Sequence, residues 1–313
     1  MLDKFSKKNL KIENNIFTKN FLTSLDESIL NLEQEYYPKI SIVMPSFNQS
    51  KFIERSILSV LNQKYPNTEL IIVDGGSEDG TANIINKYKN KIAFFISEKD
   101  QGQSDALNKG FKICTGQIYG WLNSDDIYLP GVFWHIVSLF NDHVDKKIFF
   151  GDWISIDKKD NIIDYNHSFN FNLNHFKYEG FHLNAQSMFW RKSVHDKFSG
   201  FDINLYNTMD YQMILEFGIN EGQKSYFRTS KALAGFRRYD GQKTAGMDFN
   251  VIKEHKAIAK RYNYLDKYEF NGWIKRFYFR IRRSFWYVKR GGISNLIYRL
   301  IQSYSNILKV TNK

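Results

Sequence analysis

The 313-residue sequence contains a single cysteine, Cys114, and no long apolar run. One cysteine excludes an internal disulfide framework and fits a reducing compartment. No window approaches the ~18 consecutive apolar residues of a membrane-spanning helix. The opening residues MLDKFSKKNLKIENN also lack the apolar core of a signal peptide. We therefore expect a cytoplasmic protein without a transmembrane helix.

Several familiar catalytic and nucleotide-binding motifs are also missing. The sequence has neither a G-x-G-x-x-G dinucleotide motif nor a glycine-rich loop that ends in Lys-Ser/Thr. Its seven histidines show no zinc-binding spacing, and no G-x-S-x-G motif is present. These absences argue against Rossmann dehydrogenases, P-loop enzymes, zinc hydrolases and α/β-hydrolases.

The composition is that of a globular protein, with 42% apolar and 25% charged residues. The chain divides into three parts. Residues 1–37 form a polar N-terminal extension, residues 38–245 contain all the regularly patterned segments, and residues 246–313 are basic and aromatic. The net charge of +11 makes the position of the basic residues a clue to partners.

The middle part alternates short apolar runs with amphipathic segments. The runs at residues 40–44, 69–74, 92–98 and 118–122 are typical of buried strands. Between them, residues 50–63, 81–90 and 104–116 have helical spacing, with Ser50 as the expected cap of the first helix and Ile113 in the apolar stripe of the third. This alternation predicts an α/β fold with a mainly parallel sheet, whose ligand crevice lies at the carboxyl ends of the strands.

Polar clusters occur at exactly those strand ends. The segment DGGSEDGT, residues 74–81, is either an ordinary turn or a binding loop at a helix N-terminus. The pair Asp125–Asp126 is either a solvated cap or a site for a hard cation. Mg²⁺ or Mn²⁺ prefers carboxylate oxygens and commonly completes its shell with phosphate oxygens. We therefore expect the pair to bind a metal–diphosphate.

These motifs together resemble glycosyltransferase family 2. The similarity covers residues 38–245 and includes SIVMPSFNQ, VDGGSEDGT, SDALNKG and LNSDD in that order. The resemblance implies a GT-A fold, in which a Rossmann-like, mainly parallel sheet with helices on both faces is accompanied by a smaller acceptor-side sheet. It also implies inverting transfer from a nucleotide-diphosphate sugar.

The resemblance further implies donor-site residues. The nucleoside would contact the end of the first strand and the acid of the second, and the sugar or ribose would contact the third helix. The matching residues are Pro45, Ser46, Phe47, Asn48, Asp74 and Asp105. Asp126 would be the direct ligand of Mg²⁺ or Mn²⁺, and Asp125 would contact the ribose or metal-bound water. The family commonly has two acids in a row where this chain has Asp74 and Gly75, so the identity of the base stays open.

Asp210 matches the position of the catalytic base, at the start of the segment DYQMILEF. The alternative is an acid that only interacts with the helix dipole. Arg237 or Arg238 matches a position near the diphosphate, with surface arginine as the alternative. His182 and Gln186 match the acceptor side, or are ordinary packed polar residues.

Residues 271–290 contain seven Lys or Arg and no acidic residue. Ile274, Phe277, Ile281, Phe285 and Val288 share one face at helical spacing, while Phe279 and Trp286 lie outside it. This pattern favours a peripheral helix on an anionic membrane surface. Packing on the catalytic domain and nucleic-acid binding are the alternatives, and we expect no nucleic-acid partner.

The sequence therefore predicts a glycosyltransferase that moves a sugar, most simply from a UDP-sugar, to a saccharide or lipid-linked acceptor in cell-surface polysaccharide or glycolipid biosynthesis. One alternative is a nucleotidyltransferase, although PSFNQS lacks the basic residues of a phosphate loop. The other is a non-catalytic relative that binds nucleotide sugars.

Overall fold

The computed structural model describes residues 37–180, 183–243, 249–286 and 288. The expectation for residues 1–37 therefore falls almost entirely outside the described residues, as does His182. The description below concerns the catalytic region and the helices that follow it.

Four parallel strands form the first half of the sheet. They are β1 (Ile40–Ser46), β2 (Thr68–Asp74), β3 (Phe94–Ser97) and β4 (Ile118–Trp121), in the spatial order β3-β2-β1-β4. Every residue of β1 is buried, which fits its β-branched and apolar sequence. Because the strands are parallel, the segments after residues 46, 74, 97 and 121 all meet at one edge.

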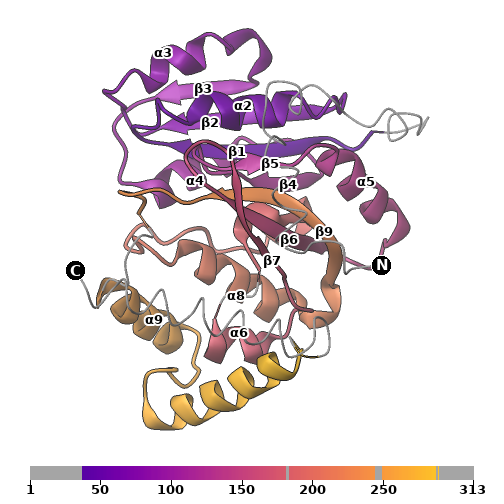
Figure 1. Cartoon of the computed structure of the whole chain (residues 1–313), viewed down its shortest axis with the longest axis vertical. Coiled ribbons are helices and arrows are strands. Elements are labelled where there is room, and N and C mark those ends of the chain that lie inside the picture. Colours follow the sequence, from indigo (N-terminus) through magenta and orange to yellow (C-terminus); the bar gives the residue numbers. More distant parts are fainter. Residues whose placement is uncertain (1–36, 181–182, 244–248, 287, 289–313) are drawn as a thin grey trace.

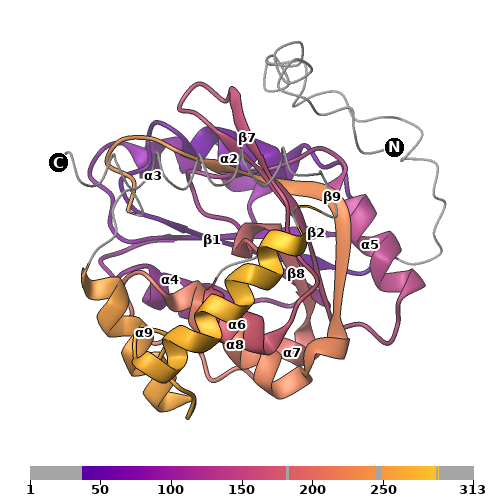
Figure 2. The ribbon, with the colours of Figure 1, turned by 60° about the horizontal axis from the view of Figure 1, so that its bottom comes forward.

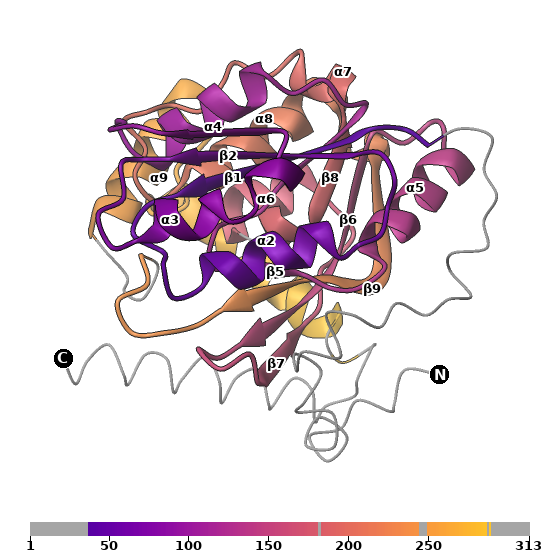
Figure 3. The same cartoon turned by 90° about the horizontal axis from the view of Figure 1, so that it is seen from above.

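Helices cover both faces of this sheet (Figure 3). Helices α2 (Ile53–Leu61), α3 (Thr81–Asn86) and α5 (Val132–Asp142) lie on one side, where Ile42 and Met44 point. Helices α4 (Gln103–Lys112), α6 (Leu173–Glu179) and α8 (Met209–Glu221) lie on the other side with Val43. The predicted alternation is confirmed.

Two local expectations are wrong. Helix α2 begins after Phe52, and no side chain caps it, whereas Ser50 lies in the preceding turn. Ile113 follows the end of α4 and is 38% exposed, because the helix stops before the last position of its apolar pattern.

The second half of the chain extends the same sheet. Strand β8 (Met188–Arg191) pairs antiparallel with β4 and with β6 (Ile148–Ile156), and β9 (Tyr226–Arg237) runs parallel to β6. β5 (Ile127–Tyr128) and β7 (Ile162–Asn166) complete it. The strands expected to form a smaller acceptor-side sheet thus continue the first one edge to edge (Figure 1). Strand β9 brings residue 237 beside residue 126.

The remaining short elements are helix α7 (Lys192–His195) and the 3₁₀ turns Lys89–Lys91, Ala185–Ser187 and Gln223–Ser225. Helix α9 (Phe249–Arg261) packs beside α8. Its Glu254 carboxylate accepts hydrogen bonds from the backbone N–H groups of Tyr206, Asn207 and Thr208, directly before α8. A side chain of α9 therefore fixes the start of α8.

Residues 270–286 form a further helix that crosses the outside of α6 and α8 (yellow in Figure 2). Phe279 is buried and stacks on Tyr178, and the ring of Trp286 lies 4.0 Å from that of Phe169. The predicted apolar stripe points the other way: Phe277 and Phe285 are 54% and 71% exposed. Packing on the catalytic region thus occurs, but through residues outside the stripe.

Within the described residues, no helix combines the length and the apolar character needed to cross a membrane.

Candidate active site

The loop after β4 is joined to the end of β9 by a buried network around Asp126. The Asp126 side chain has no exposed surface. Its Oδ1 accepts a hydrogen bond from the Arg237 backbone N–H (2.8 Å), and its Oδ2 accepts one from Asn123 Nδ2 (3.3 Å). Both oxygens of Asp126 are thus engaged inside the protein.

Arg237 is also completely buried. Its Nε donates to the Asp125 carbonyl (2.7 Å), and its Nη1 donates to the Asp157 carbonyl (2.9 Å) and to the Asp160 carboxylate. The predicted contact between Arg237 and a phosphate is therefore wrong, because the guanidinium has no surface for a ligand. The neighbouring Arg238 is exposed.

Asp125 differs from Asp126 in keeping part of its surface exposed. Its Oδ2 accepts a hydrogen bond from the Tyr239 hydroxyl (3.0 Å). Burial raises the pKa of Asp125, and burial together with the Asp125 charge raises the pKa of Asp126 well above its usual range. The Arg237 charge opposes this rise in pKa for both carboxyls. Asp125 keeps an exposed part of its surface, so a cation could approach it from the solvent side.

No three His, Cys, Asp or Glu side chains of the described residues come together as a ready metal site. Mg²⁺ and Mn²⁺ do not require one, since one or two carboxylates combined with substrate phosphates are enough. The residues present therefore fit a metal that arrives with a diphosphate.

The predicted base, Asp210, lies in the first turn of α8 and is half-buried. Burial raises the pKa of the Asp210 carboxyl to about 6. The hydrogen bond from the Tyr211 N–H and the positive charge of Lys243 act in the opposite direction and lower this pKa. A carboxylate with a pKa near 6 is suited to accept a proton near neutral pH.

A chain of side chains joins the surroundings of Asp210 to the acid pair. Lys243, whose charge acts on Asp210, donates from Nζ to Gln103 Oε1 (3.1 Å). Gln103 Nε2 in turn donates to Asn123 Oδ1 (2.8 Å), and Asn123 donates to Asp126. Residues separated by more than a hundred positions in the sequence thus belong to one site.

At the end of β1, the nucleoside-side residues divide into buried and exposed. Pro45 and Ser46 are buried, and Ser46 Oγ has no hydrogen-bond partner in the part of the chain that the structure describes. Phe47 is 60% exposed. Asn48 has a positive φ of 51° and accepts from the Glu78 N–H (3.0 Å), which ties this turn to the loop after β2.

The carboxylates of the two other predicted donor-site acids, Asp74 and Asp105, have partners within the protein. Asp74 is buried and accepts hydrogen bonds from the Ser77 N–H (2.9 Å) and from the hydroxyls of Ser77 and Ser97. It therefore shapes the loop, and its predicted contact with the base does not fit this geometry. Asp105 forms an ion pair with Lys109 (3.3 Å) and remains partly exposed.

Sequence reasoning did not single out Gln103, Tyr239 and Lys243, although all three lie in segments that the resemblance placed at the donor site. Gln103 begins QSDALNKG, and Tyr239 and Lys243 follow Arg237 and Arg238 in LAGFRRYDGQKT. Gln186, an expected acceptor-side residue, is 5% exposed and fits the packed alternative.

Comparison with known proteins decides the family. Residues 41–198 match the model of glycosyl transferase family 2. An uncharacterized glycosyltransferase of Rickettsia typhi is 30% identical over 239 residues, which cover 72% of each chain. The chain belongs to glycosyltransferase family 2. This glycosyltransferase spans a smaller share, between 18% and 37%, of seven other curated relatives that it matches.

Two solved structures show the same fold. S. aureus TarS in complex with UDP-GlcNAc has a TM-score of 0.62 at 18% identity, covering 81% of this chain and 74% of that one. The mannosyltransferase PcManGT from Pyrobaculum calidifontis, in complex with GDP-Man and Mn²⁺, has a TM-score of 0.51 at 14% identity, covering 75% and 69%. The predicted GT-A-like fold and transferase class are confirmed, so the nucleotidyltransferase alternative is not retained.

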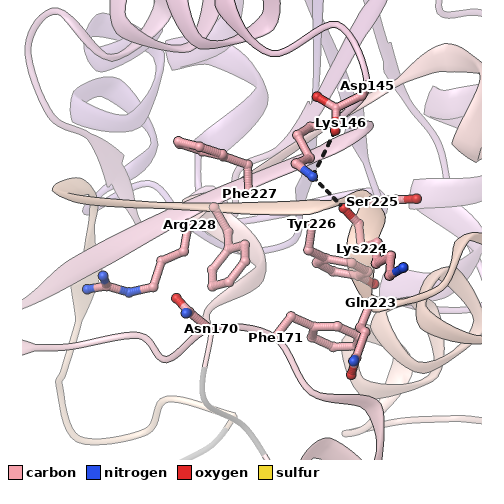
Figure 4. A pocket seen from close by; sticks show the side chains of 11 residues that line it. Asp145, Lys146, Asn170, Phe171, Gln223, Lys224, Ser225, Tyr226, Phe227 and Arg228 are labelled. Carbon is pink, nitrogen blue, oxygen red and sulfur yellow. Dashed lines mark hydrogen bonds and ion pairs between the residues drawn. The ribbon is translucent and has the colours of Figure 1, made fainter.

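A cavity of about 570 Å³ lies elsewhere in this glycosyltransferase (Figure 4). Lys146, Phe171, Tyr226 and Arg228 are among its lining residues. It lies at the start of β9, whereas Arg237 is the last residue of that strand. It contains none of the predicted site residues.

The position of Arg237 leads to a prediction about stability. Arg237→Met should lower the free energy of unfolding by about 3 kcal/mol, because it leaves buried Asp and carbonyl oxygens without their donor. Urea unfolding measures this, with Arg238→Met as the exposed control that changes stability by less than ~0.5 kcal/mol. An Arg237→Met protein of normal stability that has lost nucleotide binding would contradict the structural role.

Proposed function

We propose that this enzyme transfers a sugar, with inversion at the anomeric carbon, from a UDP-sugar to a hydroxyl of a saccharide or lipid-linked acceptor. The observation that carries the proposal is the hydrogen-bonded chain from Lys243, beside Asp210, to the acid pair. This chain joins the surroundings of Asp210, which is suited to accept a proton, to the Asp125–Asp126 pair, which is suited to bind a metal–diphosphate. The UDP-GlcNAc complex of TarS supports UDP as the nucleotide.

On the donor side, we assign the nucleoside to the turn formed by Pro45, Ser46, Phe47 and Asn48, where Phe47 offers an exposed ring to a base. Mg²⁺ or Mn²⁺ would be held by Asp125, supported from behind by Asp126. This reverses the expected order of the two acids, because Asp126 is fully buried and Asp125 is not. A divalent ion there stabilises the negative charge that develops on the leaving diphosphate.

The cations for the diphosphate are Lys243 and Arg238 in this proposal. Both are exposed, in contrast to Arg237. Lys243 Nζ also lies 4.1 Å from the centre of the Tyr206 ring, and desolvation lowers its pKa. An ammonium placed between Gln103 and Asp210 would attract a diphosphate and leave the base close to the reacting carbon.

In the transfer step, the acceptor oxygen forms a bond to the anomeric carbon while the bond from that carbon to the diphosphate oxygen breaks. The diphosphate leaves with the bonding electron pair, and the acceptor proton goes to the Asp210 carboxylate. Attack from the face opposite the diphosphate converts an α-linked donor into a β-linked product.

Donor binding is tested by thermal shift with UDP, GDP, CDP and ADP, each with Mn²⁺, Mg²⁺ or EDTA. UDP with metal should raise the melting temperature, since binding to the folded state adds about 2.7 kcal/mol at a hundredfold excess over Kd. Asp125→Asn should abolish the metal-dependent part. The control Asp145→Asn, an exposed aspartate on another loop, should retain it. Absence of any shift with wild-type protein would sink the proposal.

The role of Asp210 is tested by kinetics. Asp210→Asn should lower kcat by about 10²–10⁴-fold while retaining UDP binding. In the wild type, kcat/KM should fall as the pH drops through about 6, because protonation removes the base. Asp202→Asn is the matched control, since Asp202 binds Asn204 through Oδ1 and Arg261 through Oδ2 and has no part in the proposed transfer step. An unchanged acid limb, or equal losses in both variants, would argue against Asp210 as the base.

The C-terminal helix supports a further part of the proposal, peripheral binding to an anionic membrane. Its outward stripe leaves Ile274, Phe277, Ile281 and Phe285 between 42% and 71% exposed. Residues 271–286 add five Lys or Arg and no acid. Arg280 and Arg283 pair with Glu179 of α6, so the remaining basic residues are those that would complement anionic headgroups. Such a position would present the active site to a lipid-linked acceptor.

Vesicle sedimentation checks this part. The full chain should bind vesicles containing phosphatidylglycerol more tightly than pure phosphatidylcholine vesicles, and added salt should weaken the binding. Phe277→Asp combined with Phe285→Asp should reduce binding at least about tenfold, since each ring loses its burial in the lipid. Val144→Asp, which changes a 79% exposed apolar residue elsewhere, is the control. Equal binding by all three proteins would refute membrane contact through this helix.

A further inference from the structure

Gly75, at the end of β2, is covered by the side chain of Asp100. A Cβ atom added to Gly75 would lie 2.9 Å from Asp100 Oδ2 and 3.0 Å from Oδ1. The backbone of Gly75 is not in the left-handed region, so its conformation does not require glycine. The absence of a side chain at 75 instead makes room for the Asp100 carboxylate.

Asp100 has one oxygen available for a ligand. Its Oδ1 accepts a hydrogen bond from the Gly102 N–H (2.8 Å), whereas Oδ2 has no donor among the residues that the structure describes. The residue is partly exposed. Nearby Asp74 differs, because serine donors occupy both of its oxygens. Of these two carboxylates, only that of Asp100 can accept a further hydrogen bond from outside.

Asp100 lies next to the strand end assigned to the nucleoside. β1 and β2 are in register from Ile40 to Ser46, and the Gly75 N–H donates to the Ser46 carbonyl (2.9 Å). Ser46 Oγ is buried and has no partner within the described part of the chain. Exposed Phe47 follows directly. The free carboxylate oxygen, an unsatisfied hydroxyl and an aromatic ring therefore occur at one edge.

We propose that Asp100 recognises the donor base, accepting a hydrogen bond from the imide N–H of a uracil-type ring. The inference rests on the proposed function and adds the residue that selects the nucleotide. The Asp100 carboxylate occupies the space that an acidic side chain at position 75 would fill.

The chemistry of the bases favours an imide. A single free carboxylate oxygen matches the one ring N–H of uracil or thymine. Guanine presents two neighbouring donors that would need both oxygens, and Oδ1 is already used by Gly102. Cytosine and adenine offer an amino donor from which a carboxylate can accept. Their adjacent ring nitrogen is unprotonated, however, so the ring N–H that uracil and thymine offer is absent.

The test exchanges the position of the acid. Kd values for UDP, dTDP, CDP, GDP and ADP with Mn²⁺ are measured calorimetrically on the full-length protein, comparing wild type, Asp100→Ala, Asp100→Asn and the double variant Gly75→Asp/Asp100→Ala. Asp100→Ala should weaken UDP binding about tenfold or more, the loss of one hydrogen bond to a charged group. The double variant should recover most of that loss.

Asp100→Asn should narrow the preference for UDP over CDP, because an amide both donates and accepts. Gly75→Asp alone should lower the melting temperature more than it does in the Asp100→Ala background, since two carboxylates then compete for one space. Glu98→Gln, an exposed acid on the same segment, is the control for charge and should bind UDP as the wild type does.

The outcomes separate the two proposals. Tightest binding of UDP or dTDP, lost in Asp100→Ala and regained in the double variant, supports an imide-reading acid, and the ratio of UDP to dTDP shows whether the 5-methyl group is tolerated. UDP binding that survives in Asp100→Ala, or a loss that the double variant does not repair, overturns the role of Asp100 alone. A wild-type preference for GDP overturns both the role of Asp100 and the proposed UDP-sugar donor. A wild-type protein that binds no nucleotide overturns this inference and the proposed function together.

Discussion

The hydrogen bond from the Arg237 backbone to Asp126 is the contact on which the arrangement of the site depends. It joins the loop after the fourth parallel strand to the end of the last long strand, 111 residues later in the chain. The buried guanidinium then fastens Asp125 and the loop of residues 157–160 to the same point. The buried carboxylates of Asp126 and Asp160 and the buried guanidinium of Arg237 are costly to desolvate unless they are mutually satisfied. Here, the folded state supplies nearly all their partners, and this fixes the geometry around the exposed face of Asp125.

With these contacts in place, the exposure of each acidic side chain determines its role. Fully engaged carboxylates, such as Asp74 and Asp126, shape loops. Partly exposed ones, such as Asp100, Asp125 and Asp210, keep surface for a ligand. The same distinction applies to the cations, since Arg237 is structural and Lys243 and Arg238 are accessible. A residue's position in a motif therefore indicates the site, while its burial indicates its part in it.

The sequence was sufficient for the elements that depend on local patterns. The four parallel strands, the helices between them and the family could all be predicted, because alternation and motif order lie within short segments. The position of Asp210 in the first turn of a helix could also be predicted, whereas its role as the base stays a proposal. The burial of Arg237, the reversed exposure of Asp125 and Asp126, and the Gln103–Lys243 contact could not, because each depends on contacts between segments 100 or more residues apart. Likewise, the stripe on the last helix was visible in the sequence, but the inward role of Phe279 and Trp286 was not.

Glu254 gives the C-terminal segment a structural role that its basic and aromatic composition does not indicate. This side chain of α9 receives the backbone donors immediately before α8, the helix that carries Asp210. The catalytic region therefore does not end where the family resemblance ends, near residue 245. The segment beyond residue 245 supports the start of α8 through Glu254 and also carries the surface proposed to bind the membrane. Exchange of that segment between related enzymes would therefore change part of the support for the proposed base together with the proposed membrane-binding surface.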